Sequence, residues 1–381
     1  MNEILQSQTG YVAQGVNIRS NDSEPGLSKL TDVQTPFEVN MPVGDSRLAL
    51  RITPVLLSAG SMNAEAATRF GNTVVPPSAL GSQRDEGVGI SLAYELRDWG
   101  LKADIGTTPI GFDRTNAVGG VSIERPLEDN PNVRYGVTLS RRAVTDSVTS
   151  FAGSTVRTAT APDGVLSWGA VTANGGRVQM SYDDSDVGVY GYGALHSIVG
   201  HNVKSNSRVE LGGGVYRYMQ NEPDSKVTVG LSGMLMGYAN NQNFYTFGHG
   251  GYFSPQTYLS LGVPVTWAKR NEQFTFQLKG SIGLQYFQQD SADYFPTDAA
   301  AQALINQRYA EQSNSGLGYG VEASGEYRFG PKLFVGGRFA MDNARDYRQL
   351  NAGMYVRYMF ENMIGSPMAL PVSPYRSPYS N

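Results

Sequence analysis

The chain of 381 residues contains no cysteine and only three histidines. The absence of cysteine excludes a disulfide framework and thiolate metal sites. Because no apolar run reaches about 18 residues, no transmembrane helix is expected. A formal net charge of −4 gives no strong imbalance of the kind that indicates a nucleic-acid partner.

Glycine and aromatic residues are abundant instead, with 45 Gly, 22 Tyr and 15 Phe. With polar residues between them, they suit strands that have one wet face and one apolar face. The segment 273–287 shows this alternation most clearly, since every second residue from Phe274 is apolar and polar residues, among them Thr275, Gln277 and Lys279, lie between. Such a period of two predicts a β-strand with two different faces.

Runs of this kind recur along the chain and predict an all-β fold, an antiparallel transmembrane β-barrel over residues 9–360. Tight turns near 43–45, 97–100, 128–131, 183–186, 220–225, 269–272 and 330–331 alternate with longer connectors, as in outer-membrane barrels. The sixteen predicted strands are 9–19, 29–42, 45–59, 88–97, 101–109, 118–127, 132–143, 177–183, 187–196, 206–219, 225–239, 255–268, 272–287, 317–329, 332–341 and 348–360.

An even number of strands places both chain ends on the periplasmic side of a bacterial barrel. For this reason the strand-like piece Val165–Ala173 is kept out of the wall and assigned to an outer or inward-folded loop. A closed barrel also leaves no unpaired backbone edge in the lipid. Sixteen strands leave a lumen wide enough for an aqueous channel.

The two ends of the chain lie outside the predicted barrel. Leu350–Phe360 resembles the C-terminal strand signal of barrel proteins and ends in an aromatic residue. The segment 361–381 that follows is rich in Pro and Ser and is predicted to be a periplasmic tail. The N-terminus shows no export signal, so we expect a fragment of a longer precursor, with residues 1–8 as the remnant of an upstream region or linker.

Four strings of the sequence resemble one known family. LTDVQTPFEVNMPVGD (30–45), SRRAVTDS (140–147), YDDSDVGVYGYG (182–193) and FGHGGYFSPQTYLSLGVPV (247–265) are similar to the C-terminal barrel domain of the bacterial cellulose synthase operon protein C family. The resemblance covers about residues 10 to 360. It implies a monomeric sixteen-stranded channel in the bacterial outer membrane, which exports nascent cellulose, a β-1,4-glucan, to the cell surface. It also implies a periplasmic tetratricopeptide-repeat region in the full-length protein and an inner-membrane cellulose synthase complex as partners.

A glucan chain is neutral and flat, so aromatic rings stack on its faces and polar groups pair with its hydroxyls. Alternation predicts seven inward tyrosines: Tyr190, Tyr192, Tyr216, Tyr218, Tyr238, Tyr258 and Tyr355. It also predicts inward charges of both signs, among them Glu38, Arg51, Arg338 and Arg357. Mixed charge disfavours a channel tuned to a strongly charged polymer. The alternative interpretation is that these residues only fill and solvate a wide lumen.

Residues 240–255 form the most aromatic connector, and three interpretations stay open for it. It is an exposed adhesive patch, a gate folded into the barrel, or a packed loop that braces the wall. The residues concerned are Phe244, Tyr245, Phe247, His249, Tyr252 and Phe253. A second aromatic set is predicted to face outward at the membrane interfaces: Tyr94, Trp267, Tyr286, Tyr327, Tyr358 and Phe360.

No pattern in the sequence indicates catalysis, a metal or a cofactor. None of the three histidines stands in an arrangement that would make a serine a nucleophile. Asp183, Asp184 and Asp186 have the oxygen ligands that calcium prefers, but they also fit ordinary turn chemistry. The alternatives to a glucan exporter are a general or other-polysaccharide porin and an adhesive barrel whose outer loops act.

Overall fold

The computed structural model describes residues 9–71, 82–157, 164–344, 347–363 and 379. The predicted upstream remnant, residues 1–8, lies outside this part of the chain. The main sheet has eighteen strand segments. β2 and β3 form one wall strand and β10 lies beyond the wall, so the wall of the barrel has sixteen strands.

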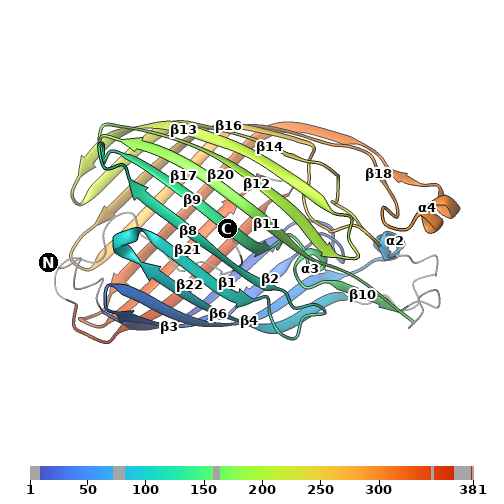
Figure 1. The fold of residues 1–381 in the computed structure, drawn as a ribbon, viewed down its shortest axis with the longest axis horizontal. Coiled ribbons are helices and arrows are strands. Elements are labelled where there is room, and N and C mark those ends of the chain that lie inside the picture. The colour runs from blue at the N-terminus through green and yellow to red at the C-terminus, as the bar shows by residue number, and fades with distance from the viewer. Residues whose placement is uncertain (1–8, 72–81, 158–163, 345–346, 364–378, 380–381) are drawn as a thin grey trace.

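The wall strands follow one another around the barrel as antiparallel neighbours (Figure 1). Their bounds are β1 (Tyr11–Asn21), β2 (Thr31–Gln34) with β3 (Phe37–Val43), β4 (Ser46–Ser61), β6 (Ser82–Leu96), β7 (Leu101–Thr107), β8 (Ala117–Pro126), β9 (Val133–Ala143), β11 (Val165–Asp183), β12 (Val187–His201), β13 (Asn206–Glu222), β14 (Ser225–Tyr238), β16 (Thr257–Arg270), β17 (Phe274–Gln289), β20 (Gln312–Arg328), β21 (Leu333–Asp342) and β22 (Gln349–Met359).

The first and last strands close the cylinder. β1 and β22 pair over their full lengths, from Tyr11 opposite Met359 to Asn21 opposite Gln349. This seam removes the open edge that lipid does not tolerate. The predicted sixteen-stranded barrel is confirmed.

The second wall strand is divided in two because proline lacks the N–H that the ladder needs. Pro36 separates β2 from β3, but the pairing with β4 keeps one register, with Gln34 opposite Val55 and Phe37 opposite Ile52. The predicted strand 29–42 is therefore one wall strand with a local break in its hydrogen bonding.

Short turns and long connectors lie at opposite ends of the barrel. The short-turn end also holds both described ends of the wall, since Phe360 N donates to Gly10 O. All seven predicted tight turns are found at this end. The loop end carries the connectors 62–81, 144–164, 239–256 and 290–311, together with four shorter ones.

The prediction for Val165–Ala173 was wrong in part, because this piece is the outer half of β11. Thr172 and Ala173 pair with both β9 and β12 and so belong to the wall. Gly169 and Ala170 both have positive φ, and this bulge redirects the strand. Beyond it, 165–168 pairs with β10 (Ser154–Arg157) above the wall. The piece prolongs a strand and adds none, so the number of wall strands stays even.

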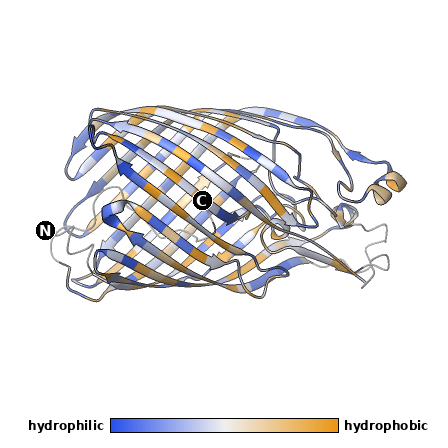
Figure 2. Ribbon diagram, viewed as in Figure 1, coloured by the Kyte–Doolittle hydropathy of each residue, from blue (hydrophilic) through white to orange (hydrophobic). Residues whose placement is uncertain are grey.

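Hydrophobic and hydrophilic residues alternate along the wall strands (Figure 2), and many of the apolar residues are exposed on the outer face. On β17, for example, Ile282 and Leu284 are about 60% exposed, which is the pattern of a face that meets lipid. Aromatic residues lie on this face near the strand ends, including five of the six predicted girdle residues as exposed side chains: Tyr94, Trp267, Tyr327, Tyr358 and Phe360. The sixth, Tyr286, is half-buried.

The long connectors fold over the loop end. They contain α2 (Ala64–Thr68), β5 (Phe70–Gly71), α3 (Val148–Phe151), β15 (Tyr245–Thr246), β18 (Ala292–Asp293), α4 (Ala299–Ile305) and β19 (Arg308–Tyr309). β15 pairs in parallel with β5 and so ties two of the connectors together. None of the helices in the described residues is long and apolar enough to cross a bilayer.

The short helix α3 lies against the inner face of β4. Its Phe151 is fully buried in a cluster with Val55 and Leu57, whose side chains alternate with the lipid-facing Leu56. Tyr379 packs on the Phe151 ring, with the centroids 5.1 Å apart. Of the predicted periplasmic tail, residues 361–381, the described part is 361–363 and Tyr379; the rest of this prediction lies outside the described residues.

Candidate functional site: the barrel lumen

The inward face of the wall lines a lumen with a cavity of about 550 Å³ in its short-turn half. Four predicted site residues meet there: Glu38, Arg51, Tyr355 and Arg357. Glu38 is 5% exposed; it accepts from Tyr11 Oη at 2.7 Å and from Arg51 Nε at 2.8 Å. The Arg357 guanidinium lies over the Tyr11 ring, 5.3 Å from its centroid. These contacts bind both sides of the β1–β22 seam from within.

Tyr355 shows how a lumen tyrosine is held flat against the wall. It lies directly opposite Gly336 on the next strand, and a Cβ built on Gly336 would be 2.3 Å from the Tyr355 ring. The ring therefore crosses the glycine, and its hydroxyl donates to Glu326 Oε2 at 2.7 Å, one strand further on. Arg357 Nη2 donates to the other oxygen of Glu326 at 2.5 Å.

The same arrangement occurs on the opposite side of the lumen. Tyr216 on β13 lies over Gly188 on β12, and its hydroxyl donates to Asp183 Oδ2 on β11 at 2.6 Å. Tyr218 donates to the same oxygen at 2.8 Å. The two tyrosine rings meet edge to face with centroids 5.8 Å apart. Asp183 is thus an anchor for two of the predicted lumen tyrosines.

Two more predicted tyrosines lie on glycines of the neighbouring strand. Tyr190 is opposite Gly214 and Tyr192 is opposite Gly212, and a Cβ on either glycine would touch the ring at under 3 Å. The Arg177 guanidinium covers the Tyr192 ring at 3.7 Å from its centroid. Tyr190 keeps 37% of its surface exposed. Both tyrosines line a cavity of about 220 Å³.

The predicted inward residue Arg338 and other charged side chains of the lumen form ion pairs. Arg338 Nη2 donates to Glu322 at 2.6 Å, and Lys279 lies 3.5 Å from the same carboxylate. Arg142 pairs with Asp104 at 2.5 Å. The lumen therefore has no field of a single sign, which suits a neutral passenger better than a charged one.

The turn with three aspartates uses its carboxylates within the turn itself. Asp184 Oδ1 accepts from the backbone N–H groups of Asp186 and Val187, and these hydrogen bonds hold the pKa of Asp184 below its usual range. Among the described residues, no group of three or more acidic, His or Cys side chains has a geometry suited to a metal ion.

The aromatic connector 240–255 is packed, and most of its predicted residues are buried. Tyr252 packs on the inward Tyr238, with centroids 6.0 Å apart, and accepts from Asn206 Nδ2. Phe253 meets the inward residues Tyr258 and Phe287 edge to face. An exposed adhesive patch is therefore wrong for these residues. The connector reaches into the mouth of the lumen and braces it.

The remaining aromatic residues of the connector bind it to other loops. Phe244 stacks on Tyr309 at 3.7 Å between centroids, and Tyr294 stacks on the Tyr309 ring at 4.9 Å. Phe247 packs on the fully buried Trp168 of β11, and the buried Tyr245 lies in β15. The connector thereby joins the outer part of β11 to the loop that precedes β20.

The connector 240–255 and the other connectors it contacts form a cap over the loop end of the barrel. His249 is the buried polar centre of this cap. Its Nε2–H donates to the carbonyl of Asp293 at 2.9 Å, while Nδ1 has no hydrogen-bond partner among the described residues. Burial, with the nearby Lys204 adding to it, lowers the pKa of His249 to about 4. The ring is therefore neutral near pH 7.

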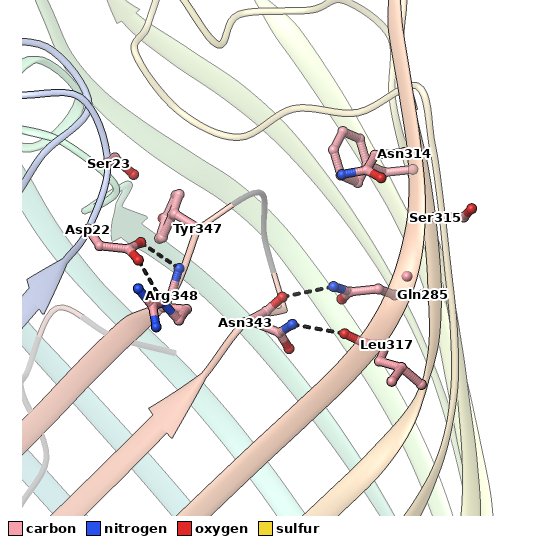
Figure 3. Close-up of a pocket in the computed structure, with 11 residues that line it drawn as sticks. Asp22, Ser23, Gln285, Asn314, Ser315, Leu317, Asn343, Tyr347 and Arg348 are labelled. Carbon is pink, nitrogen blue, oxygen red and sulfur yellow. Dashed lines mark hydrogen bonds and ion pairs between the residues drawn. The ribbon is translucent and has the colours of Figure 1, made fainter.

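A second cavity of about 480 Å³ lies at the loop end (Figure 3). Gln285 Nε2 donates to Asn343 O at 2.9 Å, and Asn343 Nδ2 donates to Leu317 O at 2.8 Å. On its other side, Arg348 forms an ion pair with Asp22 at 2.7 Å. The lumen thus has cavities toward both ends of the barrel.

Sequence reasoning missed the residues that hold the lumen tyrosines and the aromatic connector in place. Asp183 was considered only as a turn residue or a metal ligand, although its inward position in the strand period was a usable signal. Tyr309, by contrast, lies in a connector, and Trp168 lies in the outer part of β11 beyond the bulge, where no strand period predicts the contacts.

Comparisons with known proteins agree with this geometry. The family model described as "Cellulose synthase operon protein C C-terminus" matches residues 28–361. The chain belongs to this family. It is 54% identical to cellulose synthase operon protein C of Pseudomonas fluorescens over the whole chain and 29% of the relative. Identity is 35% to the Xanthomonas axonopodis protein, over 87% of the chain and 22% of the relative. The chain therefore spans less than a third of the curated relatives it matches.

A solved structure described as a bacterial polysaccharide outer membrane secretin has the same fold, with a TM-score of 0.58 at 11% identity. The alignment covers 93% of this chain and 99% of the chain in that structure. The family is a barrel domain of export and not a catalytic domain. Barrel fold, lipid-facing apolar belt and family together assign the domain to the bacterial outer membrane, in a cellulose-related role.

Proposed function

We propose that this domain conducts a nascent β-1,4-glucan from the periplasm to the cell surface. The observation that carries the proposal is the lumen wall of β12 and β13, where tyrosine rings lie flat on glycines of the neighbouring strand. Flat rings on a wall without net charge suit a neutral sugar polymer, whose faces stack on aromatic rings. Membership of a cellulose operon family supports the same passenger.

The orientation belongs to this proposal. Short turns face the periplasm in bacterial outer-membrane barrels, so both described ends of the wall lie on the periplasmic side. The polymer enters through the cavity that holds Glu38 and Arg357 and leaves beside the cavity in Figure 3. The periplasmic repeat region of the full-length protein and an inner-membrane cellulose synthase complex are the proposed partners upstream. The first tail residues, 361–363, are proposed to act at the periplasmic mouth, where Met363 packs on Phe334 and Met359, whereas Tyr379 packs on Phe151 at the loop end.

Replacement of Tyr190, Tyr192, Tyr216 and Tyr218 by Ala tests the proposal. We expect secreted glucan per assembled barrel to fall by about tenfold or more, because each stacked ring contributes about 1 kcal/mol. The matched control replaces the lipid-facing Tyr135 and Tyr182 by Ala. Secretion at the level of this control would exclude stacking on the tyrosines.

A general porin for small solutes is the second candidate, since a wide barrel with paired charges would also pass them. The packed cap argues against it, because Phe151, Tyr252 and Phe253 fill space at the loop end. A porin shows large, steady conductance in planar bilayers. The capped exporter is expected to show low conductance that rises when the connector 240–251 is deleted.

A further inference from the structure

Small residues form a continuous row across five neighbouring strands on the inner wall. The row begins beside Tyr190 on β12 and is followed from strand to strand by direct pairing across β13, β14, β16, β17 and β20. We call it the glycine row, and its members are Gly214, Ser232, Gly262, Gly283 and Gly318.

Each member of the glycine row faces the lumen. Along a strand, successive side chains point to opposite faces, and every member has an exposed apolar neighbour in sequence on the lipid face. Leu261 and Val263 flank Gly262, and Ile282 and Leu284 flank Gly283. The inner wall along the row consequently carries almost no side chain. Five strand spacings of about 4.8 Å give it a length of about 24 Å from Tyr190.

The glycine row also runs from near the short-turn end of the barrel toward the loop end. Tyr190 stands at the fourth residue of β12, close to the short-turn end. Gly318 stands ten residues before the end of β20 at the short-turn side and so lies near the loop end. A Cβ on Gly318 would be 3.4 Å from the Gln285 side chain, which borders the loop-end cavity in Figure 3. The row therefore leads from the tyrosine cluster to that cavity.

The neighbouring row on the short-turn side is nearly as smooth, whereas the row on the loop side carries Met234 and Gln285. On the short-turn side, Pro264 pairs with Ser281 and Ser281 with Gly320. The nearest charges below this row, Lys279 and Glu322, are paired with each other. The opposite wall differs, because Arg51, Arg142 and their carboxylate partners project into the lumen there.

Resting on the export function proposed above, we infer that the glycine row is the track along which the glucan slides from Tyr190 to the loop-end cavity. A wall without side chains offers no deep hydrogen-bonding wells, and a conduit needs binding weak enough for the passenger to leave. The flat, unbranched face of a neutral β-linked glucan can lie against such a wall. The tyrosines align the chain at the start, and the row lets it move on.

Leucine substitutions whose side chains project from the glycine row into the lumen provide the test. At Gly262 a new Cβ has no atom nearer than 3.5 Å, and at Gly318 none nearer than 3.4 Å, so Gly262→Leu and Gly318→Leu should fold. The control is Gly280→Leu, which lies on the lipid face with nothing within 4 Å. Gly262→Ser is a second control that keeps the row small. The readouts are secreted glucan per assembled barrel, in cells with the complete secretion system, and single-channel ion current with and without cellohexaose.

We expect Gly262→Leu and Gly318→Leu to lower secretion about tenfold, with assembly and ion conductance close to wild type. Gly280→Leu and Gly262→Ser should secrete normally. Secretion by both lumen variants at the level of Gly280→Leu would overturn the track. If secretion also persists after removal of the four tyrosines, and cellohexaose leaves the wild-type current unchanged, the export function itself fails. If only the tyrosine variant is impaired, the export function stands and the track alone is wrong.

Discussion

Tyr216 reaches Asp183 by crossing a third strand, and it does so only because residue 188 between them is glycine. The hydroxyl donates to Oδ2 at 2.6 Å, while the ring occupies the space of the missing Gly188 side chain. Tyr355, Gly336 and Glu326 repeat this relationship on the other side of the lumen. A carboxylate, a glycine and a tyrosine on three successive strands thus set the plane of a lumen ring.

Gly188→Ala should break this arrangement in one place. The new Cβ would be 2.0 Å from Tyr216 Cζ, so the ring must leave the wall and its hydrogen bond to Asp183 is lost. A hydrogen bond to a charged group contributes about 1.5–3 kcal/mol. We expect the free energy of unfolding to fall by about that amount in urea titrations of the detergent-folded barrel, with a parallel loss of glucan secretion.

Gly191→Ala is the matched control for this substitution. It lies three residues away on the lipid face of the same strand, and its nearest neighbour is 3.9 Å from a new Cβ. Its stability should stay within about 0.5 kcal/mol of wild type. Equal effects of the two alanines would show that Gly188 serves the strand backbone and not the Tyr216 ring.

The seam between β1 and β22 should depend on Glu326. This carboxylate is 3% exposed and accepts from both Tyr355 and Arg357. Removing one partner of a buried ion pair costs about 3–5 kcal/mol, because the other charge stays buried. We therefore expect Glu326→Ala to lower the unfolding free energy by about this amount, measured as the loss of heat-modifiable folded barrel on gels.

The exposed pair Glu124–Arg134 supplies the comparison, since both side chains are about half exposed. Glu124→Ala should cost at most about 1 kcal/mol. A similar cost for the two carboxylates would mean that Glu326 contributes nothing special to closure of the barrel.

The strand period predicted the wall and failed for the cap, for a physical reason. In the wall, lipid on one side and water on the other impose alternation. The face on which residues such as Leu261 and Tyr258 lie could therefore be predicted from their positions in the strand. In the cap, Trp168 and Tyr309 are fixed by contacts between distant loops, which leave no period in the sequence. The error at Val165–Ala173 has the same origin, because the bulge at Gly169 depends on the packing of β10 and Trp168.

Phe151 is predicted to keep the loop end narrow. It is fully buried and meets Phe112 edge to face at 5.2 Å between centroids. Phe151→Ala removes a core ring at a cost of about 3–5 kcal/mol, which should detach α3 from β4. We expect higher single-channel conductance in planar bilayers. Leu304→Ala on the exposed helix α4 should leave the conductance unchanged, and equal currents from both variants would contradict a structural role of α3 in the cap.

The cap should also loosen in acid, because His249 is buried in its neutral form. Its pKa is about 4 in the folded cap and near 6.5 in an unfolded loop. As pH falls from 6.5 to 4, the unfolded loop binds a proton that the folded cap does not, so stability is lost by about 1.4 kcal/mol per pH unit. Below about pH 4 both forms are protonated and the loss levels off.

Hydrogen exchange of the connector 240–255 at pH 7, 5.5 and 4.5, corrected for intrinsic rates, would measure this loss of protection. His249→Phe keeps the ring contacts with Phe244 and Tyr309 and removes the titrating group, so it should abolish most of the pH dependence between 6.5 and 4. His201→Gln, at a partly exposed histidine, should retain most of it. If wild type and His249→Phe lose protection equally, acid acts on the cap through its carboxylates, such as Asp293, and not through His249.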